Sequence, residues 1–171
     1  EDRIAHFVRV TPILFDDWFR KQTGCRVLFK CENLQKVGAF KMRGATNFCL
    51  KNREELSNGV TTHSSGNHAQ ALAHVAMELG IPAHIVMPEN SPRIKVRGVQ
   101  ESGATITFCA PTQQDRVNTM KQVQEKTGAV FVPPYDHEDI IEGQGTCAYE
   151  IHHDVTPDYI LTPVGGGGLL S

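Results

Sequence analysis

Short apolar strands alternate with helical stretches along most of the chain, and this alternation constrains its fold more than any other feature. After an extended entry at 11–14, strands are expected at 26–31, 59–63, 83–87, 105–109, 129–132 and 158–164. Helices are expected at 15–23, 42–56, 67–79, 91–103, 113–127 and 140–151. Because the pattern repeats strand then helix, it predicts an α/β fold with parallel, open, twisted sheets and helices on both faces. No repeat or linker is visible, so a second domain would have to be an insertion.

Composition excludes several classes of function. The chain has 171 residues, 40% of them hydrophobic, and a net charge of −2 without runs of like charge, so neither a nucleic acid nor a membrane is an expected partner. No apolar stretch is long enough for a bilayer span, and the N-terminus lacks the form of a signal peptide. Five scattered cysteines without a CxxC pair indicate free thiols in a reducing cytoplasm. The eight histidines show no metal-ligand spacing, so no metal site is expected in this chain.

Lys41 stands in an unusual setting for a lysine. It follows a turn at Gly38, and its neighbours are apolar: Ala39, Phe40 and Met42. An amine among apolar side chains loses the solvation of its charged form, so its pKa falls and it becomes a usable nucleophile. Condensation with an aldehyde cofactor requires such an amine. The alternative is an ordinary amphipathic helix start.

A polar loop joins the strand at 59–63 to the helix at 67–79. It offers backbone N–H groups, two hydroxyls and a helix N-terminus, through Ser64, Ser65, Gly66, Asn67 and His68. Such a loop suits a carboxylate. The alternative is a plain Ser or Asn N-cap.

Four glycines, Gly165, Gly166, Gly167 and Gly168, follow the strand expected at 158–164. Such a run costs stability unless the backbone must approach a ligand closely, and consecutive N–H groups at a helix start make a phosphate nest. A flexible linker is a poor alternative because an apolar strand precedes the run directly. A phosphate site, a carboxylate site and an apolar lysine together suit pyridoxal phosphate and an amino-acid substrate.

Several motifs in a fixed order resemble fold-type II pyridoxal-phosphate enzymes, and most of all the serine racemase and serine/threonine dehydratase family. They lie at 30–36, 38–41, 64–71, 81–83, 87–90, 143–146 and 165–169. The resemblance runs essentially end to end. It implies a tryptophan synthase β-like fold, with a large domain at 1–63 and 137–171 and a small domain inserted at 64–136.

The resemblance also assigns roles to residues. Lys41 matches the Schiff-base lysine, Phe40 packs beside the cofactor ring, and Asn67 bonds the cofactor's 3′ oxygen. The substrate carboxylate is held by the loop residues Ser64, Ser65, Gly66, Asn67 and His68. The cofactor phosphate is held by Gly165, Gly166, Gly167 and Gly168, with Leu169 completing the motif.

The activity implied is dehydration of β-hydroxy amino acids such as L-serine or L-threonine, an ammonia-lyase reaction. Lys41 removes the α-proton, the β-hydroxyl leaves, and a keto acid and ammonia result. Ser65 matches the serine from which racemases return a proton on the opposite face, where many dehydratases have alanine, so serine racemase activity is a further expectation. A homodimer is expected.

Two departures from the family pattern bear on these expectations. Ala39 stands where many relatives have serine. The sequence also stops at Ser171, just past the glycines, so a truncated chain is expected, with the pyridine-nitrogen partner and any Mg²⁺ or Mn²⁺ site outside it. The alternatives are a β-replacement enzyme of the cysteine synthase type and a catalytically incompetent fragment or binding module.

Overall fold

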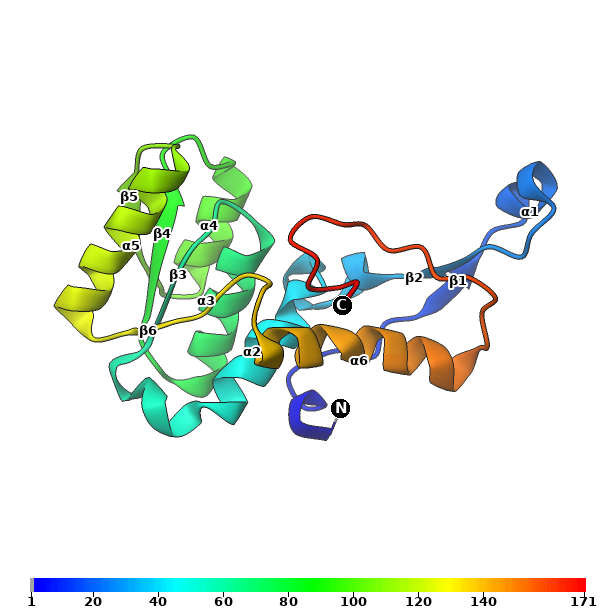
Figure 1. Cartoon of the computed structure of the whole chain (residues 1–171), viewed down its shortest axis with the longest axis horizontal. Coiled ribbons are helices and arrows are strands. Elements are labelled where there is room, and N and C mark those ends of the chain that lie inside the picture. Colours follow the sequence, from blue (N-terminus) through cyan, green and yellow to red (C-terminus); the bar gives the residue numbers. More distant parts are fainter. Residues whose placement is uncertain (1) are drawn as a thin grey trace.

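The computed structural model describes residues 2–171 and has two unlike parts. At one end a parallel sheet is packed between helices, and at the other a thin hairpin, a long helix and the C-terminal tail extend away from it (Figure 1). Helix α2 joins the two parts. Its bounds and those of the other α-helices are α1 Asp17–Thr23, α2 Lys41–Lys51, α3 Asn67–Leu79, α4 Arg93–Glu101, α5 Gln113–Thr127 and α6 Glu138–Asp154. The 3-10 helices are η1 Asp2–Ile4, η2 Glu32–Leu34, η3 Lys36–Gly38 and η4 Arg53–Asn58.

The sheet has four parallel strands in the order β5-β4-β3-β6. The strands are β3 Val60–His63, β4 Ala83–Pro88, β5 Thr105–Cys109 and β6 Val130–Phe131. Helices α3 and α4 cover one face and α5 covers the other (Figure 1). The predicted α/β fold with a parallel sheet and helices on both faces is therefore confirmed.

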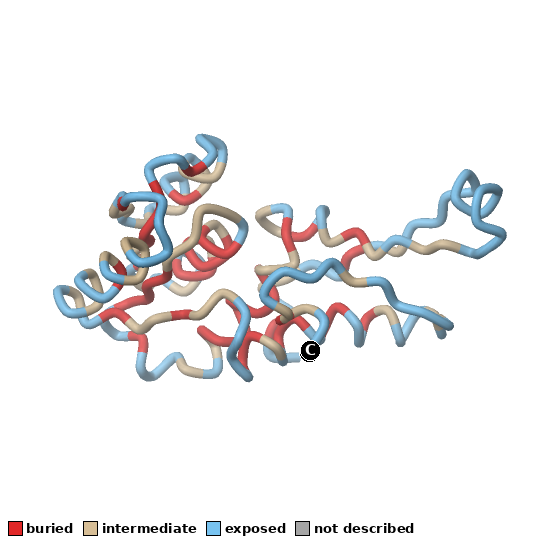
Figure 2. Tube along the Cα trace, turned by 45° about the horizontal axis from the view of Figure 1, so that its top comes forward, coloured by how far each residue is buried: buried red, intermediate tan, exposed pale blue. Residues whose placement is uncertain are grey.

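The main hydrophobic core lies between this sheet and the helices α2 and α3 (Figure 2). Ala71, Leu72, Val75 and Ala76 in the apolar stripe of α3 are fully buried. Leu79 is partly buried, and Gly80 in the left-handed conformation ends the helix after it. Strand β3 is buried on both faces, as expected for an inner parallel strand. This rigid arrangement fixes the ends of β3 and β6 relative to α2.

Helices α2 and α6 cross at an unusually close contact. A Cβ atom at Gly143 would lie 2.6 Å from the Cα of Gly44, and one at Gly44 would lie 2.9 Å from the carbonyl oxygen of Ile140. Neither position therefore accepts a side chain without displacing the other helix. The contact therefore gives Gly143, in the motif at 143–146, a packing role.

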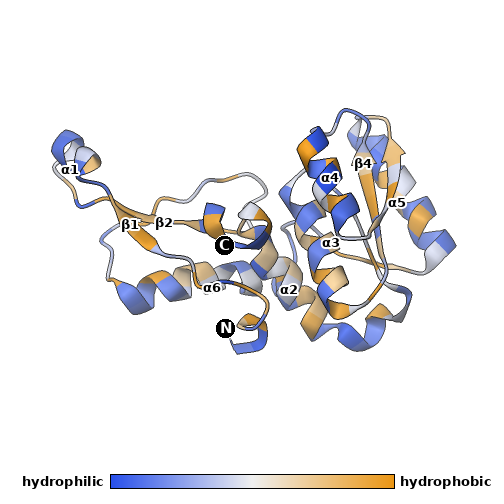
Figure 3. Cartoon of the chain, turned by 180° about the vertical axis from the view of Figure 1, so that it is seen from behind, coloured by the Kyte–Doolittle hydropathy of each residue, from blue (hydrophilic) through white to orange (hydrophobic). Residues whose placement is uncertain are grey.

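The strand expected at 26–31 does not join the parallel sheet. Its central residues form β2 (Leu28–Lys30), which pairs with β1 (Ile13–Phe15) in an antiparallel hairpin that carries α1 at its tip. The prediction of a parallel strand was wrong here because the short connection through α1 lets the preceding extended segment pair directly. Hydrophobic residues run along this hairpin (Figure 3), and Leu14, Phe15 and Phe29 are exposed.

The strand expected at 158–164 is also absent, and the tail after α6 has no regular structure. A strand needs a neighbour for its backbone N–H and C=O groups, and none of the strands among residues 2–171 pairs with this segment. Its apolar side chains are exposed instead, Tyr159 at 88% and Leu161 at 93% (Figure 2). The helix expected at 42–56 is likewise divided, with α2 ending at Lys51 and η4 following.

The division into a large domain at 1–63 and 137–171 and an inserted small domain at 64–136 stays a prediction.

Among residues 2–171, none of the helices combines the length and apolar character needed to cross a bilayer.

Candidate active site

The order of the strands points to one edge of the sheet. The chain runs from β3 to β4 and β5 on one side and returns through α5 to β6 on the other side of β3. In open α/β sheets, ligands bind beyond the carboxyl ends of the strands where the strand order reverses in this way. That point here lies between β3 and β6, and the stacked rings of His63 and Phe131, 5.7 Å apart, show that the two strand ends are adjacent.

Lys41 reaches this point from the first residue of α2. Its Nζ donates a hydrogen bond of 2.5 Å to the carbonyl oxygen of Pro134, in the loop that follows β6. The same Nζ lies 5.1 Å from the centre of the Phe40 ring and 6.0 Å from that of Tyr135. Burial lowers the pKa of Lys41 below its ordinary value of 10.5. The apolar setting expected from the sequence therefore exists, and it raises the fraction of neutral amine, the form that acts as nucleophile or general base.

The turn before Lys41 holds the backbone in a strained conformation. Val37 has a φ of 54°, the only positive value for a non-glycine among residues 2–171, and Gly38 follows with a φ of 70°. A β-branched residue in the left-handed region costs on the order of 1–3 kcal/mol. Such strain persists where the surrounding structure determines the backbone path.

His68 is fully buried beside this lysine. Its Nε2 lies 3.0 Å from the carbonyl oxygen of Val132 and must carry the proton of this hydrogen bond, because a carbonyl only accepts. Burial, together with the charges of Lys41 and His63, lowers the pKa of His68 to about 4, so the ring is neutral at pH 7. Its Nδ1 is buried without a hydrogen-bond partner among residues 2–171. His68 and Lys41 thus fix the loop after β6 at two successive points.

The loop at 64–66 leaves the N-terminus of α3 free of a side-chain cap. The N-cap residue is Gly66, which has no side chain to accept from the first helical N–H groups, and the Ser64 hydroxyl accepts only from Gly66 N. The alternative of a plain Ser or Asn N-cap is therefore wrong. The uncapped end directs N–H groups and the positive end of the helix dipole toward the same edge of the sheet, a setting that suits an anion. Ser65 lies half-buried in this loop.

The glycine run lies against Tyr135, next to the loop that Lys41 contacts. A Cβ atom at Gly166 would come within 2.2 Å of the Tyr135 ring, and one at Gly168 within 3.1 Å of its backbone. Gly167 has a φ of 87°, and its carbonyl oxygen accepts from the N–H groups of Leu170 and Ser171. The close approach that the glycines were expected to allow is therefore made here by Tyr135, and Leu169 lies half-buried at the end of the run.

A buried cluster of four charges fixes the other side of α2. Arg43 is fully buried and forms paired hydrogen bonds with Glu32 and with Glu150, at 2.6–2.9 Å. Lys30 Nζ lies 2.5 Å from the same Glu150. Burial disfavours the charged form of both Arg43 and Glu150. The hydrogen bonds outweigh it and hold the pKa of Arg43 above, and that of Glu150 below, the ordinary values. Two positive and two negative charges thus balance, and they anchor α2 two residues after Lys41.

The sequence did not single out three residues that the structure places at this edge or around it. Tyr135 and Pro134 follow the strand at 129–132, and the carboxyl end of a parallel strand was an available signal. Arg43 gave no signal of its own, because an arginine in a helix is usually exposed. No group of three or more His, Cys, Asp or Glu side chains among residues 2–171 is arranged to hold a metal ion.

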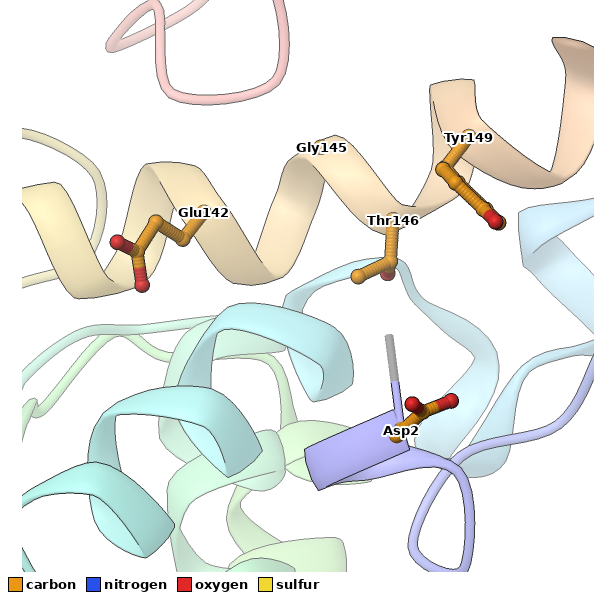
Figure 4. Close-up of a pocket in the computed structure, with 5 residues that line it drawn as sticks. All are labelled: Asp2, Glu142, Gly145, Thr146 and Tyr149. Atoms are coloured by element: carbon orange, nitrogen blue, oxygen red, sulfur yellow. The ribbon is translucent and has the colours of Figure 1, made fainter.

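A hollow lies on another side of the molecule. It has a volume of about 370 Å³, is lined by Asp2, Glu142, Gly145, Thr146 and Tyr149, and opens between η1 and α6 on the side away from the tail (Figure 4). None of the predicted site residues lines it.

Comparison with known proteins decides the family. A family model described as pyridoxal-phosphate dependent enzyme matches residues 4–171. The chain belongs to the pyridoxal-phosphate dependent enzymes. β-Hydroxyaspartate dehydratase of Paracoccus denitrificans is 46% identical over 173 residues, which cover 99% of this chain and 55% of the relative. Serine racemase of Dictyostelium discoideum is 43% identical over 171 residues, covering 99% and 53%.

Solved structures agree with this pyridoxal-phosphate family assignment. The structure of maize serine racemase superposes with a TM-score of 0.96 at 44% identity and covers 99% of this chain and 52% of the maize protein. The predicted membership in the fold-type II enzymes, and within them the likeness to serine racemases and dehydratases, is confirmed. The chain spans about half the length of the curated relatives it matches.

Proposed function

We propose that the protein carrying this chain is a pyridoxal-phosphate-dependent dehydratase (ammonia-lyase) of β-hydroxy amino acids, with serine racemisation as a second activity. One observation carries the proposal. The amine of Lys41, with a lowered pKa, lies where the order of parallel strands reverses, beside the loop after β6. The names of the relatives, a β-hydroxyaspartate dehydratase and serine racemases, support the same reaction class.

The residues at this edge fit a phosphorylated aldehyde. Lys41 supplies an amine without a carboxylate partner among residues 2–171, so burial is the one influence on its pKa. Phe40 supplies an aromatic face beside it, and Asn67 supplies an amide for the 3′ oxygen. The glycines at 165–168 supply backbone without side chains, with Gly166 and Gly168 against Tyr135 and Leu169 directly after them. When bound, pyridoxal phosphate supplies an electron-withdrawing ring that stabilises negative charge on the substrate α-carbon.

The chain's own groups would then divide the remaining work. Backbone N–H groups from Ser64 to His68, at the uncapped N-terminus of α3, bind the substrate carboxylate. Lys41 Nζ takes the α-proton, and the hydroxyl leaves from the β-carbon. Phe40 and Tyr135 exclude water from the amine. The Ser65 hydroxyl, if it delivers a proton to the opposite face of the α-carbon, gives the other enantiomer instead of elimination.

Four further points belong to this proposal. The substrate is a small β-hydroxy amino acid, and the choice among serine, threonine and β-hydroxyaspartate is left to the assay. Residues 64–136 form a small domain inserted in a large one. The exposed apolar side chains of the hairpin support burial in a homodimer. Five free cysteines, four of them buried, support a cytoplasmic location.

The proposal is tested with the purified protein and added pyridoxal phosphate. Visible absorbance should appear, and borohydride should fix the cofactor to the peptide that contains Lys41, which mass spectrometry identifies. Each β-hydroxy amino acid is then assayed for keto acid, ammonia and product chirality. A protein that stays colourless, or that is labelled at another side chain, would refute the cofactor role. Cofactor uptake without keto acid or racemisation would refute the reaction but not the cofactor.

A further inference from the structure

Lys95 on α4 connects two amide side chains at the start of α3. Its Nζ donates a hydrogen bond of 2.6 Å to Asn67 Oδ1 and another of 2.9 Å to Gln70 Oε1. Asn67 and Gln70 are three residues apart and lie on the same side of the first turn of the helix. One ammonium group from the neighbouring helix thus holds both amides at the end of α3 that faces the candidate site.

This contact fixes which way the Asn67 amide points. An ammonium group has three donors and no acceptor, so the atom facing Lys95 must be the carbonyl oxygen of the amide. The two N–H donors of Nδ2 are therefore directed away from Lys95. No group among residues 2–171 accepts a hydrogen bond from Nδ2, and Asn67 is exposed. The arrangement presents an oriented pair of donors without a protein partner.

The support for Lys95 is itself built by a close contact between helices. A Cβ atom at Gly98, one turn after Lys95 on α4, would lie 2.0 Å from Nε2 of Gln70. Glycine at this position lets the Gln70 amide lie against α4, where its oxygen can meet the lysine. The close packing of α3 on α4 thus places one of the two acceptors of Lys95.

We propose that Lys95 is a positioning residue that acts through Asn67. It holds the Asn67 carbonyl so that the Nδ2 donors face the 3′ oxygen of pyridoxal phosphate. Gln70, which packs against Gly98, accepts a second hydrogen bond from Lys95 and keeps the lysine in place. The inference deepens the proposed function and rests on it, because Asn67 is assigned to that oxygen there. It gives Gln70, in the motif at 64–71, a role that the sequence alone did not suggest.

The test is a double-mutant cycle on cofactor affinity in the complete protein. The variants are Lys95→Met, Asn67→Ala and both together, with Lys95→Arg as the conservative variant. Arg97→Met is the matched control, since Arg97 lies on the same helix and pairs with exposed Glu101 at 2.7 Å. Affinity is measured by titrating the cofactor-free protein with pyridoxal phosphate. Urea unfolding of the cofactor-free proteins and the pH dependence of the bound cofactor's absorption spectrum are recorded beside it.

We expect Lys95→Met to weaken cofactor binding about tenfold, equal to about 1.4 kcal/mol, and to shift the spectral pH midpoint. Arg97→Met should match the wild type in both measurements. Adding Lys95→Met to Asn67→Ala should weaken binding no further, because the positioned group is already gone. Lys95→Arg should restore part of the affinity. Equal loss from Lys95→Met in both backgrounds, or a loss of unfolding stability with unchanged affinity and spectrum, would show a tether between α3 and α4 and overturn the proposal.

These outcomes separate this inference from the function on which it rests. If the wild-type protein binds no pyridoxal phosphate, the proposed function fails first. If the wild-type protein binds it and Lys95→Met binds it equally well, only the role of Lys95 fails.

Discussion

Lys41 and Arg43 are two residues apart on α2 and meet opposite surroundings. Arg43 reaches a buried cluster in which Glu32 and Glu150 balance its charge and that of Lys30. Lys41 reaches only the neutral carbonyl of Pro134 and two aromatic rings. Ion pairs compensate the loss of solvation at Arg43, whereas no opposite charge compensates it at Lys41. One region is therefore suited to hold α2 in place, and the other to react.

Lys30 and Lys41 differ in the same way. Lys30 is 7% exposed and lies 2.5 Å from a carboxylate of Glu150, and its Nζ also donates to the Thr11 carbonyl. Lys41 has no such carboxylate, and burial lowers its pKa. Burial alone thus does not make a lysine reactive. Burial without a compensating charge does, because the charged form then loses solvation and gains no ion pair in return.

The largest expected effect is on turnover when the reactive lysine is removed. Lys41→Ala should lower the rate of elimination by at least about 10³-fold, because both cofactor attachment and the base are lost. Borohydride should no longer fix the cofactor to the protein. Lys36→Ala is the control, since Lys36 lies five residues earlier and its Nζ pairs with Glu78 at 2.6 Å. Elimination by Lys41→Ala at the wild-type rate would contradict the role of this amine.

The charge-balanced region should show its largest effect in stability. Arg43→Met leaves two carboxylates against one lysine in the cluster, and we expect it to lower the free energy of unfolding by about 3–5 kcal/mol. Arg97→Met removes an exposed pair and should cost less than about 1 kcal/mol. Urea unfolding at pH 7 measures both.

A double variant sharpens this prediction. Arg43→Met with Glu150→Met leaves Lys30 and Glu32, one charge of each sign, and should be less destabilised than Arg43→Met alone. Equal loss in the single and double variants would mean that packing volume, and not charge balance, holds α2.

The two regions also differ in how far the sequence predicted them. Helix α3 was predicted at 67–79 and has those bounds, because its apolar stripe and Gly80 both lie within the segment itself. Lys41 was predicted from its own neighbours in sequence. Its contact with Pro134 joins residues 93 positions apart, and no local pattern specifies such a pairing. The charge cluster left one signal, Glu150 on the buried side of α6 at helical spacing from Gly143 and Cys147.

The failed strand at 158–164 shows the same limit. Its apolar residues predicted a buried strand, but these side chains are exposed. A sequence pattern does not reveal which neighbour would supply the hydrogen bonds of a sheet. For the strand at 28–30, the prediction of parallel pairing was wrong for the opposite reason. The nearby segment at 13–15 supplied an antiparallel partner, which the strand–helix alternation did not indicate.

A smaller effect is expected from the loop before α3. Ser65→Ala should lower racemisation by about 10²-fold, the usual contribution of one acid–base group, and should largely preserve elimination. Chiral analysis of serine and a keto acid assay on the same sample give the ratio. Ser102→Ala is the control, because that hydroxyl donates only to the Gly98 carbonyl at the end of α4. Equal loss of both activities would mean that Ser65 orients the substrate and does not carry a proton.

The smallest effect tests the comparison between the lysines by the sign of a stability change. Lys41→Met should raise the free energy of unfolding of the cofactor-free protein, on the order of 1 kcal/mol, because an uncompensated charge is replaced by an apolar side chain of similar length. Lys30→Met should lower it by about 2 kcal/mol, because Glu150 loses a charged hydrogen-bond partner. Two substitutions of the same kind would then act in opposite directions.

The pH dependence of the Lys41→Met gain follows from the direction of the pKa shift. The folded protein holds the pKa of Lys41 below the ordinary 10.5, so between these two pKa values the unfolded chain binds a proton that the folded chain does not. The cost to the wild type is therefore complete below the folded pKa and disappears as the pH rises through 10.5. Urea unfolding of wild type and Lys41→Met should converge over that range. A difference that stays constant with pH would assign the gain to packing, and the contrast between a paired and an unpaired buried lysine would lose its electrostatic basis.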